Sequence, residues 1–395
     1  MSERMSQRLG PEFFASIQGG LRARLAHDGL GALLTDSPED VAYLTGFFHH
    51  PGERPVAVWL DGDGRVVLLV PELERENAER QRAAAELVSY PEYPGVVPPF
   101  HVLAAALAPA IGLAVGHAPS MSWERLSAAR EALPAAEFRA TRLLVQARGI
   151  KHPDEIALHE EAARITDRMI AAGVALVAER ASERGELPSE AELASHVTSV
   201  GVRTMYAEHR DVVVVSPLAG ALVYTAANSA YPHGLPSGRR LQPGDTFMLS
   251  LGCAVGGRFV EGERTFVVGA PTAQQREYHD AVRAAHAAAM QATAPGIECR
   301  EANARSLAVI RDAGLGGFLR HRLGHGIGLG MHEPPWLEDG DATVLEAGMV
   351  ISNEPGIYVP GHAGYRISDS MLVTAEGSRA LTAFPRGLDD CVIPF

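Results

Sequence analysis

Helical and strand-like patterns alternate over the first part of the chain. Residues 14–28 place apolar side chains at helical spacing, and residues 31–35 form a short apolar run that is typical of a strand. Two further apolar runs, 56–60 and 66–70, flank a turn rich in Asp and Gly, which predicts a β-hairpin. We therefore expect an α/β domain over residues 1–148.

The remainder of the chain begins with a longer helical pattern and then becomes rich in strands. A helix is predicted over residues 153–181, because Asp154 and Glu155 fall in its first turn and apolar residues recur on one face. The β-rich runs that follow are 212–216, 246–251, 264–268, 349–352 and 371–374, and a second helix is predicted at 273–294. This order is typical of an α+β domain, here over residues 149–395, with an antiparallel sheet covered by helices.

Composition and charge narrow the classes of function. The formal net charge is -13 and no run of Lys and Arg could neutralise phosphates, which argues against a nucleic acid as partner. The start of the chain is polar and no apolar stretch is long enough to span a bilayer, so we expect neither a signal peptide nor a membrane partner. Cys253, Cys299 and Cys391 are widely spaced and lack a CxxC pair, which favours reduced thiols and a cytoplasmic location.

Candidate chemistry is concentrated in the second domain, in segments that bring together His, Glu, Arg and Gly. Each segment alone is a weak indication, since a single His in a turn, such as His233, is more often a solvated loop residue than a catalyst. Together they predict an active site. The segments are 228–234 (NSAYPHG), 261–265 (EGERT), 324–333 (GHGIGLGMHE), 353–358 (NEPGIY) and 364–369 (GYRISD).

The order and spacing of these motifs resemble those of a known family. PHG, ERT, GHGIGLxxHE, EPG and YRxxD are similar to the motifs of the pita-bread family, which includes creatinase, prolidase, aminopeptidase P and methionine aminopeptidase. The first domain resembles the creatinase-type N-terminal domain, so the resemblance covers nearly the whole chain. It implies a creatinase-type α/β domain followed by a pita-bread catalytic domain.

In the peptidase members of that family, two metal ions are held by two Asp, a His and two Glu. On this chain the resemblance places these ligands at Ser250, Glu261, His325, Glu354 and Ser368. A neutral serine hydroxyl is a poor ligand for a hard divalent cation, and it replaces a carboxylate at two positions. We therefore expect no dinuclear centre and no cofactor. A single ion held by Glu261, His325 and Glu354 remains as the alternative.

Creatinase, a metal-independent member, departs from the peptidase pattern in a similar way, which leads to our main expectation. It resembles this chain in having a serine at the first ligand position and a Glu directly before the Arg-Thr pair, where this chain has Glu263. We therefore predict a metal-independent hydrolase that cleaves a C–N bond in a small amidino, guanidino or cyclic amidine acid. His233 resembles the creatinase histidine that acts as general acid and base.

The resemblance also implies roles for the other residues of the site. Glu263 and Glu354 are expected to bind the cationic group of the substrate, with Glu261 as a further candidate. His325 and His332 complete the predicted catalytic set. The predicted substrate-binding residues are Arg54, Glu261, Tyr358, Arg366 and Phe48. The expected partner is a small molecule with a carboxylate and a cationic C–N group.

Two other hypotheses stay open. The first is a metal-dependent Xaa-Pro dipeptidase or aminopeptidase with a degenerate metal site, which the overall likeness to prolidase favours. The second is a non-catalytic pita-bread protein that binds a partner. Arg54 resembles the creatinase arginine that reaches the substrate across a dimer interface, so a homodimer is expected. Glu354 has a structural alternative as well, which is an ion pair with Arg366.

Overall fold

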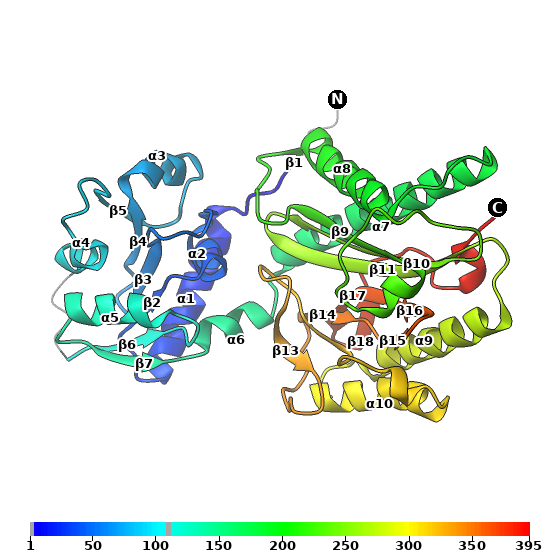
Figure 1. Ribbon diagram of the computed structural model, residues 1–395. Helices are drawn as coiled ribbons and strands as arrows, with labels where there is room; N and C mark the ends of the chain where they lie inside the picture. Colours follow the sequence, from blue (N-terminus) through cyan, green and yellow to red (C-terminus); the bar gives the residue numbers. More distant parts are fainter. Residues whose placement is uncertain (1–3, 108–111) are drawn as a thin grey trace. The chain divides into compact units, whose positions relative to one another are not determined.

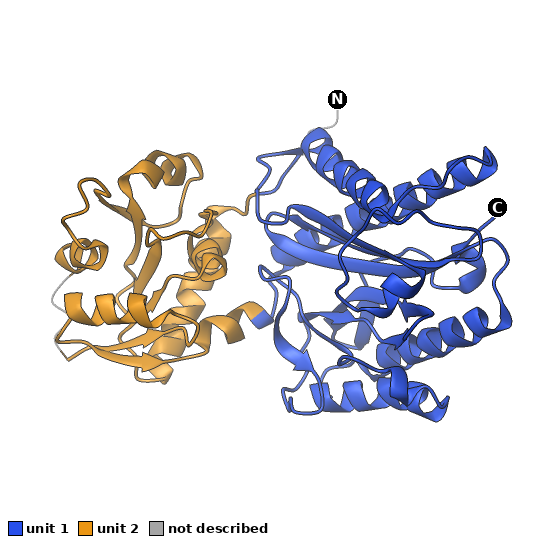
Figure 2. Cartoon of the chain, viewed as in Figure 1, with its two compact units in different colours: residues 1–7, 149–395 blue, residues 8–148 orange. Residues whose placement is uncertain are grey.

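The computed structural model describes residues 4–107 and 112–395, and the chain divides into two compact units (Figure 2). Residues 8–148 form the first, here called the N-terminal unit. Residues 149–395 form the second, the C-terminal unit, together with residues 1–7 at the start of the chain. The α/β domain and the pita-bread domain that the sequence predicts correspond in class to these two units.

The N-terminal unit is built on a mixed sheet of six strands in the order β5-β4-β3-β2-β6-β7 (Figure 1). β3 and β4 form the predicted hairpin, and β2 pairs antiparallel with β3 and parallel with β6. The strands are β2 (Ala32–Thr35), β3 (Ala57–Asp61), β4 (Val66–Pro71), β5 (Glu86–Tyr90), β6 (Ala114–His117) and β7 (Glu137–Ala140). The helices are α1 (Pro11–His27), α2 (Pro38–Thr45), α3 (Glu72–Arg80), α4 (Pro99–Ala106), α5 (Trp123–Ala132) and α6 (Leu143–Gly149).

The C-terminal unit contains a nine-stranded sheet whose main path is β13-β12-β14-β17-β11-β10-β9, with β18 on β17 and β19 on β11. The neighbours along this path for which a register is defined are antiparallel. Its strands are β9 (Ala219–Thr225), β10 (Thr246–Val255), β11 (Arg258–Val268), β12 (Gly324–Gly326), β13 (Glu333–Leu337), β14 (Val350–Asn353), β17 (Ser368–Thr374), β18 (Gly377–Ala380) and β19 (Val392–Ile393). A separate hairpin pairs β15 (Gly356–Val359) with β16 (Ala363–Arg366), and β1 (Met5–Ser6) pairs with β8 (His209–Arg210).

Four long helices pack against this sheet, as Figure 1 shows. α7 and α8 contact β9, β10 and β11, whereas α9 and α10 contact strands of the other half of the sheet. α7 starts where the sequence predicts, because His152 and Glu155 form a capping box around Pro153. The helices are α7 (Pro153–Ser182), α8 (Glu190–Glu208), α9 (Ala273–Ala292) and α10 (Cys299–Asp312), and short 3-10 turns span η1 (Ala226–Ala230), η2 (Gly316–Phe318) and η3 (Leu388–Cys391).

One predicted strand is wrong. Residues 212–216 are irregular, although their β-branched composition favours a strand. Asp211 adopts a left-handed conformation (φ 54°) and ends β8 after two residues, and the backbone N–H of Val213 donates to the Gln7 side chain at 3.0 Å. The segment is therefore anchored to the start of the chain instead of a sheet neighbour, and Pro217 directly after it cannot donate to a ladder.

The register of the central strands brings acidic residues to one face of the sheet. Glu261 and Glu263 of β11 are two residues apart, so their side chains point to the same face. Ser250 of β10 lies opposite Glu263, and Ser368 of β17 lies opposite Glu263 on the other side. β11 is buried along its whole length, so these carboxylates lie inside the unit.

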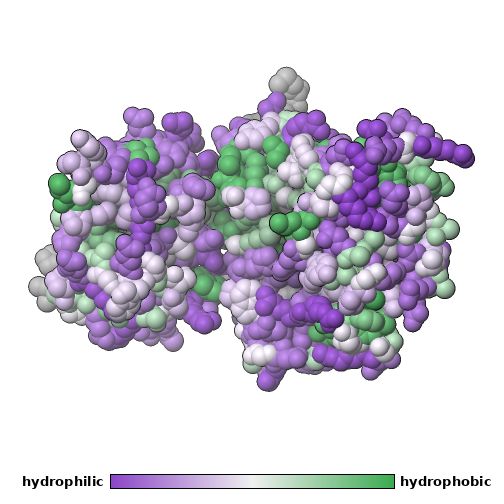
Figure 3. Space-filling model, viewed as in Figure 1, coloured by the Kyte–Doolittle hydropathy of each residue, from purple (hydrophilic) through white to green (hydrophobic). Residues whose placement is uncertain are grey.

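The surface drawn in Figure 3 carries mostly hydrophilic side chains, as expected for a globular protein. Apolar side chains gather in smaller patches on this face. Among the described residues, no helix combines the length and the apolar character needed to cross a bilayer.

Candidate functional site

A cavity of about 380 Å³ opens over the acidic face of the sheet, and its lining belongs to the C-terminal unit. Its volume is in the range of small-molecule and short-peptide sites. The lining combines carboxylates, imidazoles and guanidinium groups with the apolar side chains of Leu222 and Met331. The lining residues are Leu222, His233, Ser250, Glu261, Glu263, His321, Arg322, His325, Met331, His332, Glu338, Glu354 and Arg366.

His325 lies at the centre of this group, on β12. Its Nδ1–H donates to the carbonyl of Gly326 at 3.0 Å, which leaves Nε2 directed at the carboxylates. Nε2 lies 3.4 Å from Oε1 of Glu354 and 3.8 Å from Oε1 of Glu261, and it makes no well-aligned hydrogen bond with any described residue. A histidine that donates one ring N–H to a carbonyl and turns the other nitrogen toward acidic ligands has the usual arrangement of a metal ligand.

The electrostatics of the group favour a positive charge between the carboxylates. Burial opposes a proton on His325, but Glu261 and Glu354 outweigh it and raise the pKa of the imidazole to about 9. Burial and the neighbouring charge of Glu261 raise the pKa of Glu354 to about 7. Both directions have one cause, which is an excess of buried negative charge that a proton or a bound cation would neutralise.

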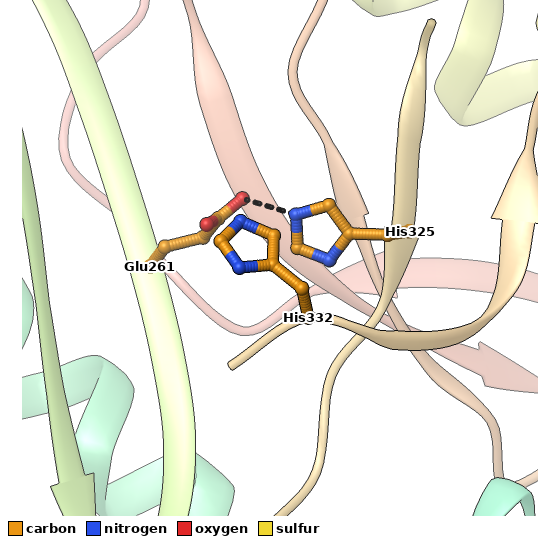
Figure 4. A group of neighbouring side chains, drawn as sticks. All are labelled: Glu261, His325 and His332. Carbon is orange, nitrogen blue, oxygen red and sulfur yellow. Dashed lines mark ion pairs between the residues drawn. The ribbon is translucent and has the colours of Figure 1, made fainter. Parts of the chain in front are cut away.

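Three of these side chains have the geometry of a metal site. Glu261, His325 and His332 each offer a ligand atom, and these atoms lie within 4.8 Å of one another (Figure 4). Ligand atoms on one zinc-like ion are roughly 3 to 4.3 Å apart, so a small adjustment would bring all three onto a single ion. The donor set, a buried carboxylate and two imidazoles with Glu354 beside them, therefore fits one divalent ion.

The opposite side of the cavity has a different chemistry. Nη2 of Arg366 donates to Oε1 of Glu263 at 2.7 Å, and its Nε pairs with Oε2 of the same carboxylate. The Ser250 hydroxyl donates to Glu263 and accepts from Arg366 at 3.2 Å. The structural alternative that paired Arg366 with Glu354 is wrong. The hydroxyl of Thr265 on β11 donates to the backbone carbonyl of Arg366 and accepts from its backbone N–H. These two hydrogen bonds bring the Arg366 side chain to Glu263.

Tyr358 lies behind Arg366 and does not line the cavity. Its hydroxyl accepts from Nη1 of Arg366 at 2.9 Å and lies 2.8 Å from Nε2 of His321. Nδ1 of His321 lies 2.7 Å from the carbonyl of Arg322, to which only an N–H can donate, so Nε2 accepts the Tyr358 proton. Burial and the charge of Arg366 lower the pKa of His321 to about 4, in agreement with this neutral tautomer. Tyr358 therefore orients Arg366 and His321.

His233 reaches the cavity from an exposed loop that follows η1. Beneath this loop lies Glu190, which is fully buried at the start of α8. Its carboxylate accepts hydrogen bonds from the backbone N–H and hydroxyl of Thr225 at 2.7 and 2.8 Å, and from those of Ser237 at 2.8 and 2.6 Å. Both ends of the loop are thus fixed to one carboxylate.

His332 follows a glycine-rich loop that is held by a buried ion pair. Glu333, its neighbour, lies 3.0 Å from Nζ of Lys151, and both side chains are almost completely buried. Oε2 of Glu333 also accepts from the backbone N–H of Gly330 at 3.3 Å. A Cβ at Gly328 would lie 2.1 Å from the Glu333 carboxylate, so a larger residue there would displace this carboxylate from its ion pair.

Phe48 and Arg54 belong to the N-terminal unit, on the segment between α2 and β3. Arg54 is half-exposed, and its Nε lies 3.7 Å from a carboxylate oxygen of Glu53. Arg125 donates to the carbonyls of Gly52 and Glu53 at 3.1 and 2.7 Å and so supports this segment. The substrate-binding role of Phe48 and Arg54 stays a prediction.

Sequence reasoning missed several lining residues. His321 and Arg322 stand four and three residues before His325, and the His-x-x-x-His spacing in HRLGH could have pointed to His321. Glu338 and Leu222 carry no comparable signal. Glu338 directly follows β13 and Leu222 lies in the middle of β9, and only the folded sheet brings these two strands to one cavity.

Comparison with known sequences shows the family. The sequence model of metallopeptidase family M24 matches residues 157–375, and that of the creatinase/prolidase N-terminal domain matches residues 19–150. The chain belongs to metallopeptidase family M24. An uncharacterized peptidase of Staphylococcus aureus (strain bovine RF122 / ET3-1) is 31% identical over 360 residues, which cover 89% of this chain and 94% of that protein. The predicted fold, a creatinase-type N-terminal domain followed by a pita-bread domain, is confirmed.

Solved structures of two dipeptidases and a prolidase superimpose on nearly the whole chain. Dipeptidase PepE from Mycobacterium ulcerans has a TM-score of 0.83 and 29% identity, covering 98% of this chain and 100% of that one. The prolidase from Pyrococcus horikoshii OT3 has a TM-score of 0.81 and 27% identity, covering 94% and 99%. The Xaa-Pro dipeptidase from Bacillus anthracis has a TM-score of 0.81 and 26% identity, covering 96% and 99%.

These findings correct our main functional expectation. A metal-independent hydrolase of an amidino or guanidino acid is wrong, because the chain belongs to a metallopeptidase family and the relatives named above are peptidases, dipeptidases and a prolidase. The expectation gave two substituted positions, Ser250 and Ser368, more weight than the likeness of the entire chain. The findings support a hydrolase, and the metal-dependent Xaa-Pro dipeptidase that stood as the alternative fits them better.

Proposed function

We propose that this M24 protein is a metal-dependent peptidase that hydrolyses the peptide bond of a short substrate, with Xaa-Pro dipeptides as the first class to test. The observation that carries the proposal is the convergence of Glu261, His325 and His332 in the cavity, with ligand atoms within 4.8 Å. Relatives of similar length and domain order are named as dipeptidases and prolidases, which supports the substrate class.

The size and charge of the cavity support a short peptide as well. About 380 Å³ accommodates a dipeptide, whereas a folded protein chain could not enter. A free dipeptide carries an ammonium and a carboxylate. Arg322 and Glu338 of the lining form a partly exposed ion pair, in which Nη1 of Arg322 donates to Glu338 at 2.9 Å, and the carboxylate and ammonium of a dipeptide would compete for these two groups.

In this proposal Glu261, His325 and His332 hold the ion, and Glu354 lies beside them. The ion, when bound, would polarise the scissile carbonyl and acidify a water molecule. His233, which is exposed on its loop, is available to exchange protons with solvent and to protonate the departing nitrogen.

The proposal is tested by assaying the full-length protein with Xaa-Pro dipeptides and with matched dipeptides that lack proline. The protein is first dialysed against a chelator and then supplied with Mn²⁺, Co²⁺ or Zn²⁺. We expect turnover to disappear with the chelator and to return with metal. His325→Ala is expected to remain inactive, and His27→Ala, which changes an exposed histidine of α1, is the matched control.

Three results would count against the proposal. Turnover that is unchanged by the chelator would argue against a metal. Turnover of dipeptides irrespective of proline would keep the peptidase but remove the Xaa-Pro preference. Absence of turnover with every metal and every peptide would favour the non-catalytic binding protein instead.

A further inference from the structure

An ion pair fills one side of the cavity. Glu263 and Arg366 are each only 4% exposed, and both oxygens of Glu263 are engaged by the guanidinium. Such a bidentate pair has strong directional preference, and a buried guanidinium retains its charge at any pH at which the protein folds. Glu263 is therefore neutralised within the protein and is a poor ligand for a further cation.

The hydroxyls at the two substituted positions are also engaged. Ser250 donates to Glu263, and Ser368 donates to Oε1 of Glu261 at 3.3 Å. Ser352 donates to the same oxygen of Glu261. These hydroxyls act as hydrogen-bond donors that orient the two carboxylates, and none supplies the anionic oxygen that a hard cation prefers.

The distribution of charge favours one ion over two. Glu261 and Glu354 face His325, and their combined negative charge matches one divalent cation. A second ion beside Ser250 would lie close to the guanidinium of Arg366, whose fixed positive charge would repel it in a buried site. It would also have no carboxylate of its own.

We propose that this chain binds a single divalent cation, with Glu261, His325, His332 and Glu354 around it, and that the Glu263–Arg366 ion pair takes the place of a second ion. The inference rests on the proposed function for the first ion and deepens it by fixing the stoichiometry. The other positive charge of the cavity is a guanidinium, which belongs to the chain and cannot exchange with solution.

Metal binding to the full-length protein tests this directly. Chelator-dialysed protein is titrated with Mn²⁺, Co²⁺ and Zn²⁺ in a calorimeter, and bound metal is counted by elemental analysis. We expect one equivalent per chain. The electron paramagnetic resonance of the Mn²⁺ form should be that of an isolated ion, without exchange coupling between neighbouring ions. His325→Ala should lose the ion, whereas Ser250→Ala should keep the stoichiometry.

Designed gain of a second ion tests the role of the ion pair. The variant Ser250→Asp/Ser368→Glu supplies two carboxylates but keeps Glu263, and we expect it still to bind one equivalent tightly. Adding Arg366→Gln removes the guanidinium and leaves Glu263 as a free carboxylate, so this triple variant should bind a second equivalent. A second tight ion in the double variant would overturn the role given to the ion pair. A triple variant that folds, as judged by circular dichroism, yet binds only one ion would overturn it too.

The outcomes separate this inference from the proposed function. Two equivalents in the wild-type protein, together with chelator-sensitive peptidase activity, would overturn the single-ion site and leave the proposed function intact. No bound ion under any condition would overturn both. One equivalent without exchange coupling supports the inference.

Discussion

The carboxylate of Glu190 accepts two hydrogen bonds from the side-chain amide of Asn228, at 3.0 and 2.9 Å. Burial opposes the charge on Glu190, but hydrogen bonds from Ser237, Asn228 and Thr225 lower its pKa, so the carboxylate is ionised where it meets these donors. Every one of these donors belongs to the segment that carries His233. The position of that histidine thus depends on a residue that does not reach the cavity.

Glu190→Gln should therefore impair the loop of His233. An amide turns one acceptor oxygen into a donor and leaves donors of the loop unpaired, at a cost of about 1–3 kcal/mol in stability. A displaced proton donor should lower kcat/KM about tenfold or more. The measurements are kcat/KM and proteolysis of the 226–240 loop, with Glu277→Gln, which changes an exposed carboxylate of α9, as control. Unchanged kcat/KM with reduced stability would limit Glu190 to a structural role.

Lys151→Met should destabilise the C-terminal unit. It removes the ammonium that pairs with the buried carboxylate of Glu333, and removal of one partner of a buried ion pair costs about 3–5 kcal/mol. Denaturant unfolding measures the loss. The double variant Lys151→Met/Glu333→Leu should recover much of it, since no buried charge is left alone. Equal stability of the single and double variants would contradict this account.

Stability should fall in mild acid because of His159. Its Nδ1 lies 2.8 Å from the carbonyl of Phe259, and burial lowers its pKa to about 3. The unfolded chain, with a histidine pKa of about 6.5, binds the proton first, so the free energy of unfolding declines as pH falls from about 6.5 toward 3. The slope contributed by one proton is about 1.4 kcal/mol per pH unit at most.

His159→Gln tests this linkage, because the glutamine amide can donate to the same carbonyl without taking up a proton. We expect the variant to be less stable than wild type near neutral pH and to approach it as pH falls. His27→Gln serves as the control, since His27 is exposed on α1. Parallel stability curves for wild type and His159→Gln would show that His159 does not contribute.

Metal should raise the melting temperature of the wild-type protein but not of His325→Ala. A ligand that binds only the folded state stabilises it by about 2.7 kcal/mol at about 100 times its Kd. Thermal unfolding with increasing Zn²⁺ or Mn²⁺ measures the shift, independently of any substrate. An equal rise in His325→Ala would mean that the metal binds elsewhere.

Local sequence signals predicted most of the fold. The capping residues of α7 and the Asp-Gly turn between β3 and β4 act over a few residues, so their elements form where expected. The strand predicted at 212–216 does not form, because the side chain of a distant residue, Gln7, binds the backbone of this segment. Propensity cannot anticipate such a contact, since it depends on the tertiary arrangement.

The candidate site was predicted in part, for a similar reason. Motifs named His325, Glu261 and Glu354 as neighbours, and the structure brings them together. The partner of Arg366 could not be predicted, because Glu263 and Glu354 are both acidic and only the packing of β16 against β11 decides between them. The function was misjudged because two serine substitutions were taken to favour a metal-independent reaction over a metal-dependent one, although His332, Glu261 and His325 still converge.

Lys151 is the only lysine of the chain, and its ammonium is buried against Glu333. A lysine-specific endoprotease therefore has one peptide bond to cut, next to the boundary between the two units. Because the side chain is 3% exposed, that bond becomes available only when the ion pair opens. This single cleavage yields residues 1–151 and 152–395. Its rate would measure how often the Lys151–Glu333 ion pair beside the His332 loop opens, and no engineered label is needed.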